Sequence, residues 1–157
     1  MTWTSRNVEQ FIAERGLQGR VRPMPENTHT AEDSARALGT DTSHIAKSLL
    51  ARLSPGRFVL CIVRGDKRLD RKKLCRAAGA KRMSLATADE VLAVTGYPVG
   101  AVPPFPIRTA VPTYLDPAVL EVETVYCGGG AVDALLEVPT EELRAVTGAQ
   151  VVDLSVG

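Results

Sequence analysis

The sequence predicts one compact α+β domain covering residues 1–157. A chain of 157 residues has the usual length of a single domain, and it buries enough apolar surface to fold without a disulfide or a metal. Its 45% hydrophobic and 24% charged residues are typical of globular proteins and exclude disordered, coiled-coil and collagen-like chains. Helix-capping signals alternate with short β-branched apolar runs, without an internal repeat or a linker, which indicates helices and strands mixed in one unit.

Capping residues mark the expected helices. A threonine or aspartate, whose side chain accepts the free N–H groups of a first helical turn, precedes each of them, and a glycine follows most of them. The expected helices are 5–15 after Thr4, the segment between Thr30 and Gly39, the segment from Asp70 to Ala78, the segment from the Thr87–Glu90 capping box to Gly96, and the segment from Thr140 to about Thr147.

Apolar and β-branched runs mark the expected strands. Ser54-Pro55-Gly56 separates two of these runs, which predicts a hairpin. Asp116-Pro117 favours a short helical turn between two later strands. The expected extended segments are 20–24, 45–53, 57–64, 109–115, 121–127, 131–138 and 149–154.

Residues 97–106 differ in character from the rest of the chain. The segment Tyr97-Pro98-Val99-Gly100-Ala101-Val102-Pro103-Pro104-Phe105-Pro106 holds four prolines and one glycine. Because proline lacks an N–H group, this segment is neither a helix nor a central strand. A stiff, apolar loop in the middle of a domain is often functional.

Several segments that would place the protein outside the cytoplasm are missing from the sequence. No apolar run reaches the roughly 18 residues that span a bilayer, and the first residues lack the apolar core of a signal peptide. Cys61, Cys75 and Cys127 are odd in number and are not spaced as metal ligands, which is typical of reduced thiols. We therefore expect a cytoplasmic protein that does not associate with membranes, with a monomer as the default.

The net charge of +1 conceals a strong polarity along the chain. Residues 42–88 carry a net charge of +10 and residues 89–157 a net charge of −8. Nine basic residues fall within 64–82, against only Asp66 and Asp70. Such an excess is typical of a polyanion-binding surface, and it is equally consistent with a solvated, Lys- and Arg-rich helix face.

Lys47 is the most informative charged residue. In a strand over 45–53 it shares a face with Ile45, Leu49, Ala51 and Leu53. An ammonium group among apolar neighbours either reaches water at the edge of the sheet or meets an anion in a cleft. No carboxylate lies close to it in the sequence.

No motif for a cofactor, a metal or a catalytic triad is present. The chain lacks a nucleophile elbow, a phosphate-binding loop and a dinucleotide fingerprint, and His29 and His44 are not spaced as zinc ligands. We therefore expect neither a cofactor nor a metal. A catalytic Cys–His pair remains an open alternative.

Taken in order, several short motifs resemble the YbaK-type editing domains associated with prolyl-tRNA synthetase. The resemblance runs from about Thr30 to the C-terminus. The residues that carry it are Ile45-Ala46-Lys47-Ser48-Leu49, Val63-Arg64-Gly65-Asp66, Leu69-Asp70, Lys73-Leu74, Thr95-Gly96-Tyr97, the G-x-x-x-P segment Gly100–Pro104, Asp116 and Gly128-Gly129-Gly130.

The resemblance implies a mixed, partly barrel-like sheet of six or seven strands flanked by helices. It also implies a metal-independent hydrolase that cleaves, in trans, the ester of mischarged tRNA, with tRNA(Pro) carrying Cys, Ala or another small amino acid as the expected substrate. A synthetase pocket made for proline rejects such amino acids poorly, so a second site removes them. The implied partners are tRNA and prolyl-tRNA synthetase. The segment 131–133 lacks the basic residues of some branches, so the amino acid stays open.

The same resemblance suggests a role for each site residue. Lys47 contacts the phosphate or ribose of the terminal adenosine, and Ser48 adds a hydroxyl contact. The N–H groups of Gly100, Ala101 and Val102 polarise the scissile carbonyl or hold the water, while Pro104 stiffens their loop. The opposite wall comes from Gly128, Gly129 and Gly130. The acceptor-stem phosphates are expected to contact Arg64, Lys67, Arg68, Arg71 and Lys72.

Two further functions compete with this hypothesis. In the first alternative the protein is a non-catalytic binding module, whose cleft holds an aminoacyl-tRNA end or a small metabolite without turnover. This alternative is compatible with the same fold, because a fold does not fix a function. A thiol-dependent hydrolase instead uses Cys61 or Cys127 as its nucleophile.

Overall fold

The computed structural model describes residues 2–25 and 27–157. Within them the helices are α1 (Ser5–Arg15), α2 (Ala31–Leu38), α3 (Arg71–Ala78), α4 (Ala88–Thr95) and α5 (Thr140–Thr147), with single 3₁₀ turns at Thr42–His44 and Pro117–Glu121. The strands are β1 (Arg20–Pro23), β2 (Ala46–Leu53), β3 (Arg57–Arg64), β4 (Arg68–Leu69), β5 (Met83–Leu85), β6 (Thr113–Leu115), β7 (Thr124–Gly128), β8 (Ala134–Pro139), β9 (Gln150–Val151) and β10 (Ser155–Val156). None of the described helices is long and apolar enough to span a bilayer.

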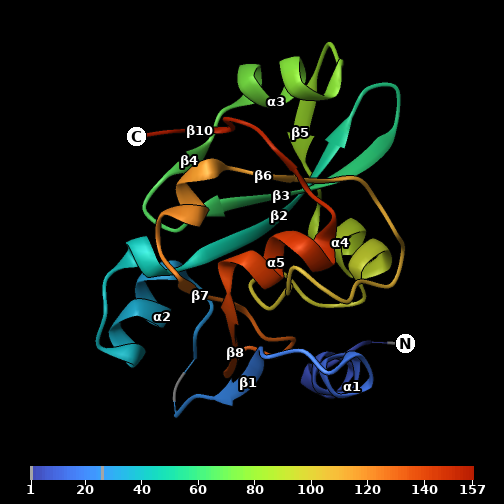
Figure 1. The fold of residues 1–157 in the computed structure, drawn as a ribbon. Coiled ribbons are helices and arrows are strands. Elements are labelled where there is room, and N and C mark those ends of the chain that lie inside the picture. Colours follow the sequence, from blue (N-terminus) through green and yellow to red (C-terminus); the bar gives the residue numbers. More distant parts are fainter. Residues whose placement is uncertain (1, 26) are drawn as a thin grey trace.

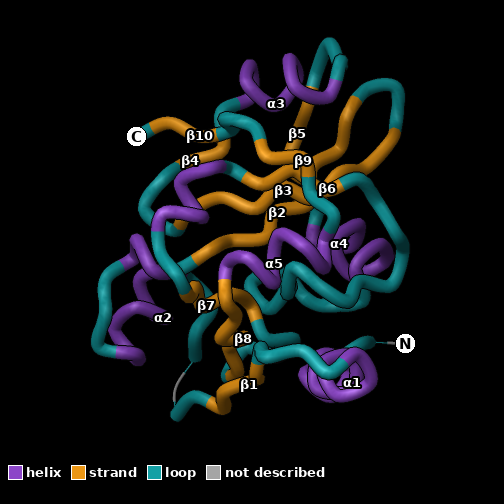
Figure 2. Tube along the Cα trace, in the orientation of Figure 1, coloured by secondary structure: helices purple, strands orange, loops and turns teal. Residues whose placement is uncertain are grey.

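The strands form three sheets. A mixed five-stranded sheet has the order β5-β2-β3-β6-β9, an antiparallel three-stranded sheet has the order β1-β8-β7, and β10 pairs with β4. In Figure 1 the three-stranded sheet lies below the five-stranded sheet, with α2 and α1 on opposite sides of it. A single parallel bridge between Ile45 and Tyr126 joins these two sheets. The α+β class is confirmed, but the strands are divided among three sheets that do not close into a barrel (Figure 2).

Local capping determines the helices. Thr4, Thr30, Asp70 and Thr87 each accept a backbone N–H group of the following first turn, as expected. The expectation that Thr140 caps α5 is wrong. Pro139 occupies the N-cap position without a side-chain bond, and the Thr140 hydroxyl donates instead to the Val122 carbonyl, at 2.8 Å.

The hairpin of β2 and β3 is the centre of the fold. Residues of its two strands pair in register from Ala46–Arg64 to Leu53–Arg57. Alternate residues enter two different cores: Leu60 and Ile62 pack with β7, β8 and α5, whereas Val59, Cys61 and Val63 pack with α3. Because both faces of the hairpin are buried, its register is fixed on both sides.

The helix α1 supports the proline-rich loop 97–106. The Trp3 N–H donates to the Gly96 carbonyl at 2.7 Å, and the Trp3 ring meets Tyr97 edge-on with centroids 6.0 Å apart. Phe11 of α1 packs against Phe105, with ring centroids 5.4 Å apart. The loop is therefore held between α1 and the core of the domain.

Candidate active site

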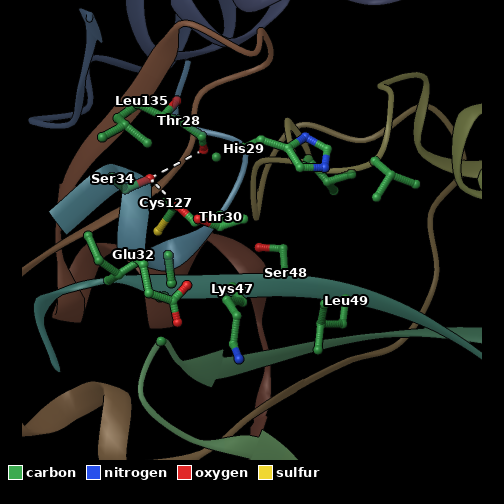
Figure 3. Close-up of a pocket in the computed structure, with 18 residues that line it drawn as sticks. Thr28, His29, Thr30, Glu32, Ser34, Lys47, Ser48, Leu49, Cys127 and Leu135 are labelled. Atoms are coloured by element: carbon green, nitrogen blue, oxygen red, sulfur yellow. Dashed lines mark hydrogen bonds between the residues drawn. The ribbon is translucent and has the colours of Figure 1, made fainter. Parts of the chain in front are cut away.

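The candidate site is a cavity of about 340 Å³ at the beginning of β2. Its walls come from the segment before α2, from β2, from the proline-rich loop and from the end of β7. Its lining includes His29, Lys47, Ser48, Gly100, Val102 and Gly128. The structure thus brings together sequence-predicted residues that lie up to 81 positions apart (Figure 3).

An incomplete sheet edge creates room for this cavity. Strand β3 pairs with all of β2, but on the other edge β5 pairs only with Ala51–Leu53. The first half of β2 therefore has no strand of the same sheet on that edge within the described residues. Residues 45–49 line the cavity at that position.

Lys47 and Ser48 leave β2 in opposite directions, as successive residues of a strand do (Figure 3). The Lys47 ammonium donates to the carbonyl of Lys67, with an Nζ–O distance of 2.7 Å. Burial lowers the pKa of Lys47, while the nearby carboxylates of Glu32 and Asp66 oppose that shift. The partners of the Lys47 ammonium, which the sequence did not reveal, are thus the Lys67 carbonyl and the carboxylates of Glu32 and Asp66, which the fold brings close.

Ser48 presents an unsatisfied hydroxyl to the cavity. Its Oγ atom is buried and has no hydrogen-bond partner among the described residues. Figure 3 shows the Ser48 side chain on the side of β2 that faces His29. An unpaired buried hydroxyl costs free energy, so this group favours a ligand that hydrogen-bonds to it.

Two of the three amide groups that were expected as donors in the proline-rich loop are free. The N–H of Ala101 donates to the Pro98 carbonyl at 3.1 Å, so it closes a turn. The N–H groups of Gly100 and Val102 donate to no acceptor within residues 2–25 and 27–157. Gly100 and Val102 line the cavity, whereas Ala101 is 1% exposed and lies outside the lining. Of the three expected donors, only the flanking two are available to a ligand.

The glycine turn and the proline-rich loop are in backbone contact. A Cβ atom on Gly128 would collide with the Val102 carbonyl oxygen and would lie 2.8 Å from the Val102 carbonyl carbon, so only glycine fits. The Gly130 N–H donates to the Ala101 carbonyl at 2.9 Å. Gly128 lines the cavity, but Gly129, Gly130 and Pro104 are buried behind its wall.

The expected tRNA-binding residues are in different situations. The Arg64 guanidinium pairs with Asp66 and Glu121, and its side chain is only 18% exposed. Arg71 donates to the Met83 carbonyl at 2.8 Å. Arg68 and Lys72 are exposed, and Lys67 belongs to the turn whose carbonyl holds Lys47. Lys67, Arg68 and Lys72 therefore remain available to phosphates, and none of the three lines the cavity.

The buried thiols are poor nucleophiles. Burial raises the pKa of Cys61 and of Cys127 to about 12. Both side chains are 0% exposed, and only Cys127 lines the cavity. Since a thiolate is the nucleophile, these values argue against the thiol-dependent hydrolase.

Sequence reasoning did not select the segment before α2 as part of the site. Residues 28–32 form one wall of the cavity, with His29 and Glu32 as its titratable side chains. The only signal in the sequence is Thr30, which caps α2 and therefore fixes where this segment turns. Its position beside β2 depends on contacts that are distant in the sequence.

Comparisons with known proteins show which family the chain resembles. A family model described as the aminoacyl-tRNA editing domain matches residues 25–146. The chain is 26% identical to EbsC of Enterococcus faecalis, a candidate Cys-tRNA(Pro)/Cys-tRNA(Cys) deacylase, with 83% of this chain and 79% of that protein covered. It is 35% identical to the proline–tRNA ligase of Solidesulfovibrio magneticus, covering 83% of this chain but only 24% of the ligase.

A solved structure shows the same fold. The chain matches the crystal structure of a candidate trans-editing enzyme for prolyl-tRNA synthetase with a TM-score of 0.89 and 38% identity, covering 98% of this chain and 97% of that one. The resemblance found in the sequence is thereby confirmed. The cavity, its main-chain donors and the matched segment all lie within one domain, and the chain belongs to the aminoacyl-tRNA editing domain family.

Proposed function

We propose that this protein hydrolyses, in trans, the ester bond of mischarged tRNA, with tRNA(Pro) carrying Cys, Ala or another small amino acid as its substrate. One observation carries the proposal: two free amide groups, an unpaired hydroxyl and an ammonium group surround one cavity of about 340 Å³. This volume is in the usual range of small-molecule sites. The names of EbsC and of the trans-editing enzyme support the substrate class and the action in trans.

The main-chain donors suit the chemistry of ester hydrolysis. Attack of water on the ester carbonyl creates a negative oxygen, which hydrogen-bond donors fixed in advance stabilise. The N–H groups of Gly100 and Val102 supply such donors on a loop supported by α1. An aminoacyl ester is already activated, so a placed water and a stabilised oxyanion are sufficient without a protein nucleophile.

Lys47 and Ser48 hold the end of the tRNA in this proposal. One of the three N–H donors of the Lys47 ammonium goes to the Lys67 carbonyl, so two remain for a phosphate or ribose oxygen. Ser48 hydrogen-bonds to the same terminal nucleotide through its free hydroxyl. Phosphates of the acceptor stem then contact Lys67 in the turn after β3, Arg68 of β4 and Lys72 of α3.

The experiment measures release of free amino acid from Cys-, Ala-, Ser- and Pro-tRNA(Pro) by the purified protein. Wild type is expected to deacylate at least one mischarged tRNA and to spare Pro-tRNA(Pro). Lys47→Ala is expected to lower kcat/KM about 10- to 100-fold, because a charged hydrogen bond contributes about 1.5–3 kcal/mol. The matched control is Lys81→Ala, which removes an exposed lysine outside the cavity.

Two results contradict the proposal in different ways. If Lys47→Ala cleaves every substrate at the wild-type rate, the role of Lys47 is wrong. If wild type binds aminoacyl-tRNA and protects its ester without releasing amino acid, the protein is the non-catalytic binding module instead.

A further inference from the structure

The first wall of the cavity carries a histidine that the proposed hydrolysis has not used. His29 lies on the segment between β1 and α2, and its imidazole is drawn in Figure 3 beside the proline-rich loop. A Cβ atom placed on Gly100 would lie 2.6 Å from Cε1 and 3.0 Å from Cγ of His29. The ring is therefore packed against Gly100, which lines the cavity and whose N–H has no acceptor among the described residues.

The backbone around His29 is fixed on both sides. The N–H and the hydroxyl of Thr28 both donate to the Val132 carbonyl, at 2.7 and 3.0 Å. The N–H of His29 itself donates to Asn27 Oδ1 at 2.7 Å. Thr30 then caps α2 by accepting the N–H of Asp33 at 3.0 Å. The imidazole thus extends from a segment whose position does not depend on a ligand.

The ring nitrogens of His29 are free. Within residues 2–25 and 27–157, neither nitrogen forms a hydrogen bond with the protein, whereas Nδ1 of His44 is 3.2 Å from the Thr40 hydroxyl. The other titratable groups on the cavity wall are Glu32 of α2, Lys47 of β2 and Cys127 of β7. Lys47 donates to Lys67, and burial keeps Cys127 protonated. Histidine is the side chain suited to exchange a proton near neutral pH.

We propose that His29 is the catalytic base and acid of the hydrolysis, an inference that rests on the proposed function. As the water oxygen bonds to the ester carbonyl carbon, the water proton passes to a ring nitrogen of His29. The resulting oxyanion accepts the N–H of Gly100. When the tetrahedral intermediate collapses, the bond from carbon to the ribose oxygen breaks, and the imidazolium returns its proton to that oxygen. The products are the free amino acid and the tRNA.

The geometry favours this role because base and oxyanion donor are adjacent. A Cβ atom on Gly100 would collide with the imidazole, so the ring lies directly against the residue that carries one of the free N–H groups. Catalysis by a positioned acid or base requires the group to reach the reacting proton directly. Glu32 is placed less well, since it is one of the acidic groups that act on Lys47.

The test compares His29→Gln with His44→Gln, which changes the other histidine of the chain and leaves the cavity intact. His29→Gln is expected to lower kcat at least about 100-fold, with KM changed less than threefold, because acid–base catalysis contributes about 10²–10⁴. His44→Gln is expected to match wild type. Since His29 is exposed, the free energy of unfolding should change little in either variant.

The dependence of kcat on pH identifies the group. In wild type and in His44→Gln, kcat should fall as the pH is lowered from about 8 to 5.5, because an imidazolium accepts no proton. This fall should be absent in His29→Gln, and added imidazole should restore activity to His29→Ala. An unchanged kcat in His29→Gln, or an acid limb that persists there, assigns the proton transfer to another group and overturns the inference. Wild type that deacylates nothing instead overturns the proposed function.

Discussion

Substitution of Gly100 by alanine tests whether the proline-rich loop holds one fixed conformation. Gly100 has a φ of +88°, a backbone conformation that side chains with a Cβ atom adopt only under strain. The added methyl group would also collide with the imidazole of His29, at 2.6 Å from Cε1. The substitution therefore carries two separate free-energy costs, at a residue that lines the cavity.

The magnitude follows from these two contacts. A non-glycine residue in such a conformation costs about 1–3 kcal/mol. Displacing the exposed imidazole of His29 from its rotamer costs about 0.5–1.5 kcal/mol. We expect Gly100→Ala to lower the free energy of unfolding by about 2–4 kcal/mol. With a urea m-value of about 2 kcal/mol/M, the midpoint of unfolding falls by about 1–2 M.

Urea unfolding of four variants separates the two costs. Gly148→Ala is the matched control, because Gly148 has a φ of +61° with open space around its Cβ position, so it bears only the backbone strain. In a His29→Ala background the effect of Gly100→Ala should shrink by about 1 kcal/mol, since the clash is absent. If Gly100→Ala lowers the free energy of unfolding no more than Gly148→Ala does, and by the same amount with and without His29→Ala, then Gly100 and His29 are not packed as the structure shows.

Three further predictions concern the basic residues and the cysteines. If Lys67, Arg68 and Lys72 each neutralise one phosphate, tRNA affinity should fall about 40-fold between about 50 and 200 mM salt. The variant with alanine at all three positions should lose most of this salt dependence. An unchanged salt dependence in that variant contradicts the proposed contacts. Iodoacetamide at pH 7.5 should add one group, at the half-buried Cys75, and leave deacylation unchanged, as mass spectrometry and the amino-acid release assay would check. Because burial raises the pKa of Cys61 and Cys127 to about 12, the unfolded chain loses these protons first. Stability should therefore fall as the pH rises from about 9 toward 12, and alanine at Cys127 should reduce that fall.

Local signals predicted the helices and the central hairpin well. The capping residues Thr4 and Thr87 act on N–H groups two or three residues away, so a short window of sequence contains the whole interaction. The cap expected at Thr140 is absent because the Thr140 hydroxyl donates to the Val122 carbonyl, 18 residues away. Strands β4 and β10, of two residues each, carry no periodicity, and they exist only because they pair with each other.

The site likewise combines features that local sequence indicates with features that depend on distant contacts. The sequence indicated Lys47, Ser48, Gly100 and the glycine turn, since each is unusual among its own neighbours. It did not indicate that the Lys47 ammonium donates to the Lys67 carbonyl, or that the Ala101 N–H closes a turn. Nor did it place His29, whose segment is anchored to a carbonyl 104 residues away.

The sequence by itself determined the class of the domain, the ends of most helices and three of the segments that line the cavity: the start of β2, the proline-rich loop and the glycine turn. Those features depend on backbone conformation and hydrogen bonds within a few residues. Only the tertiary structure decided which amide groups stay free, which hydroxyl lacks a partner and which histidine contacts the proline-rich loop. These depend on which distant groups compete for each donor and acceptor, and that competition is settled only when the chain packs.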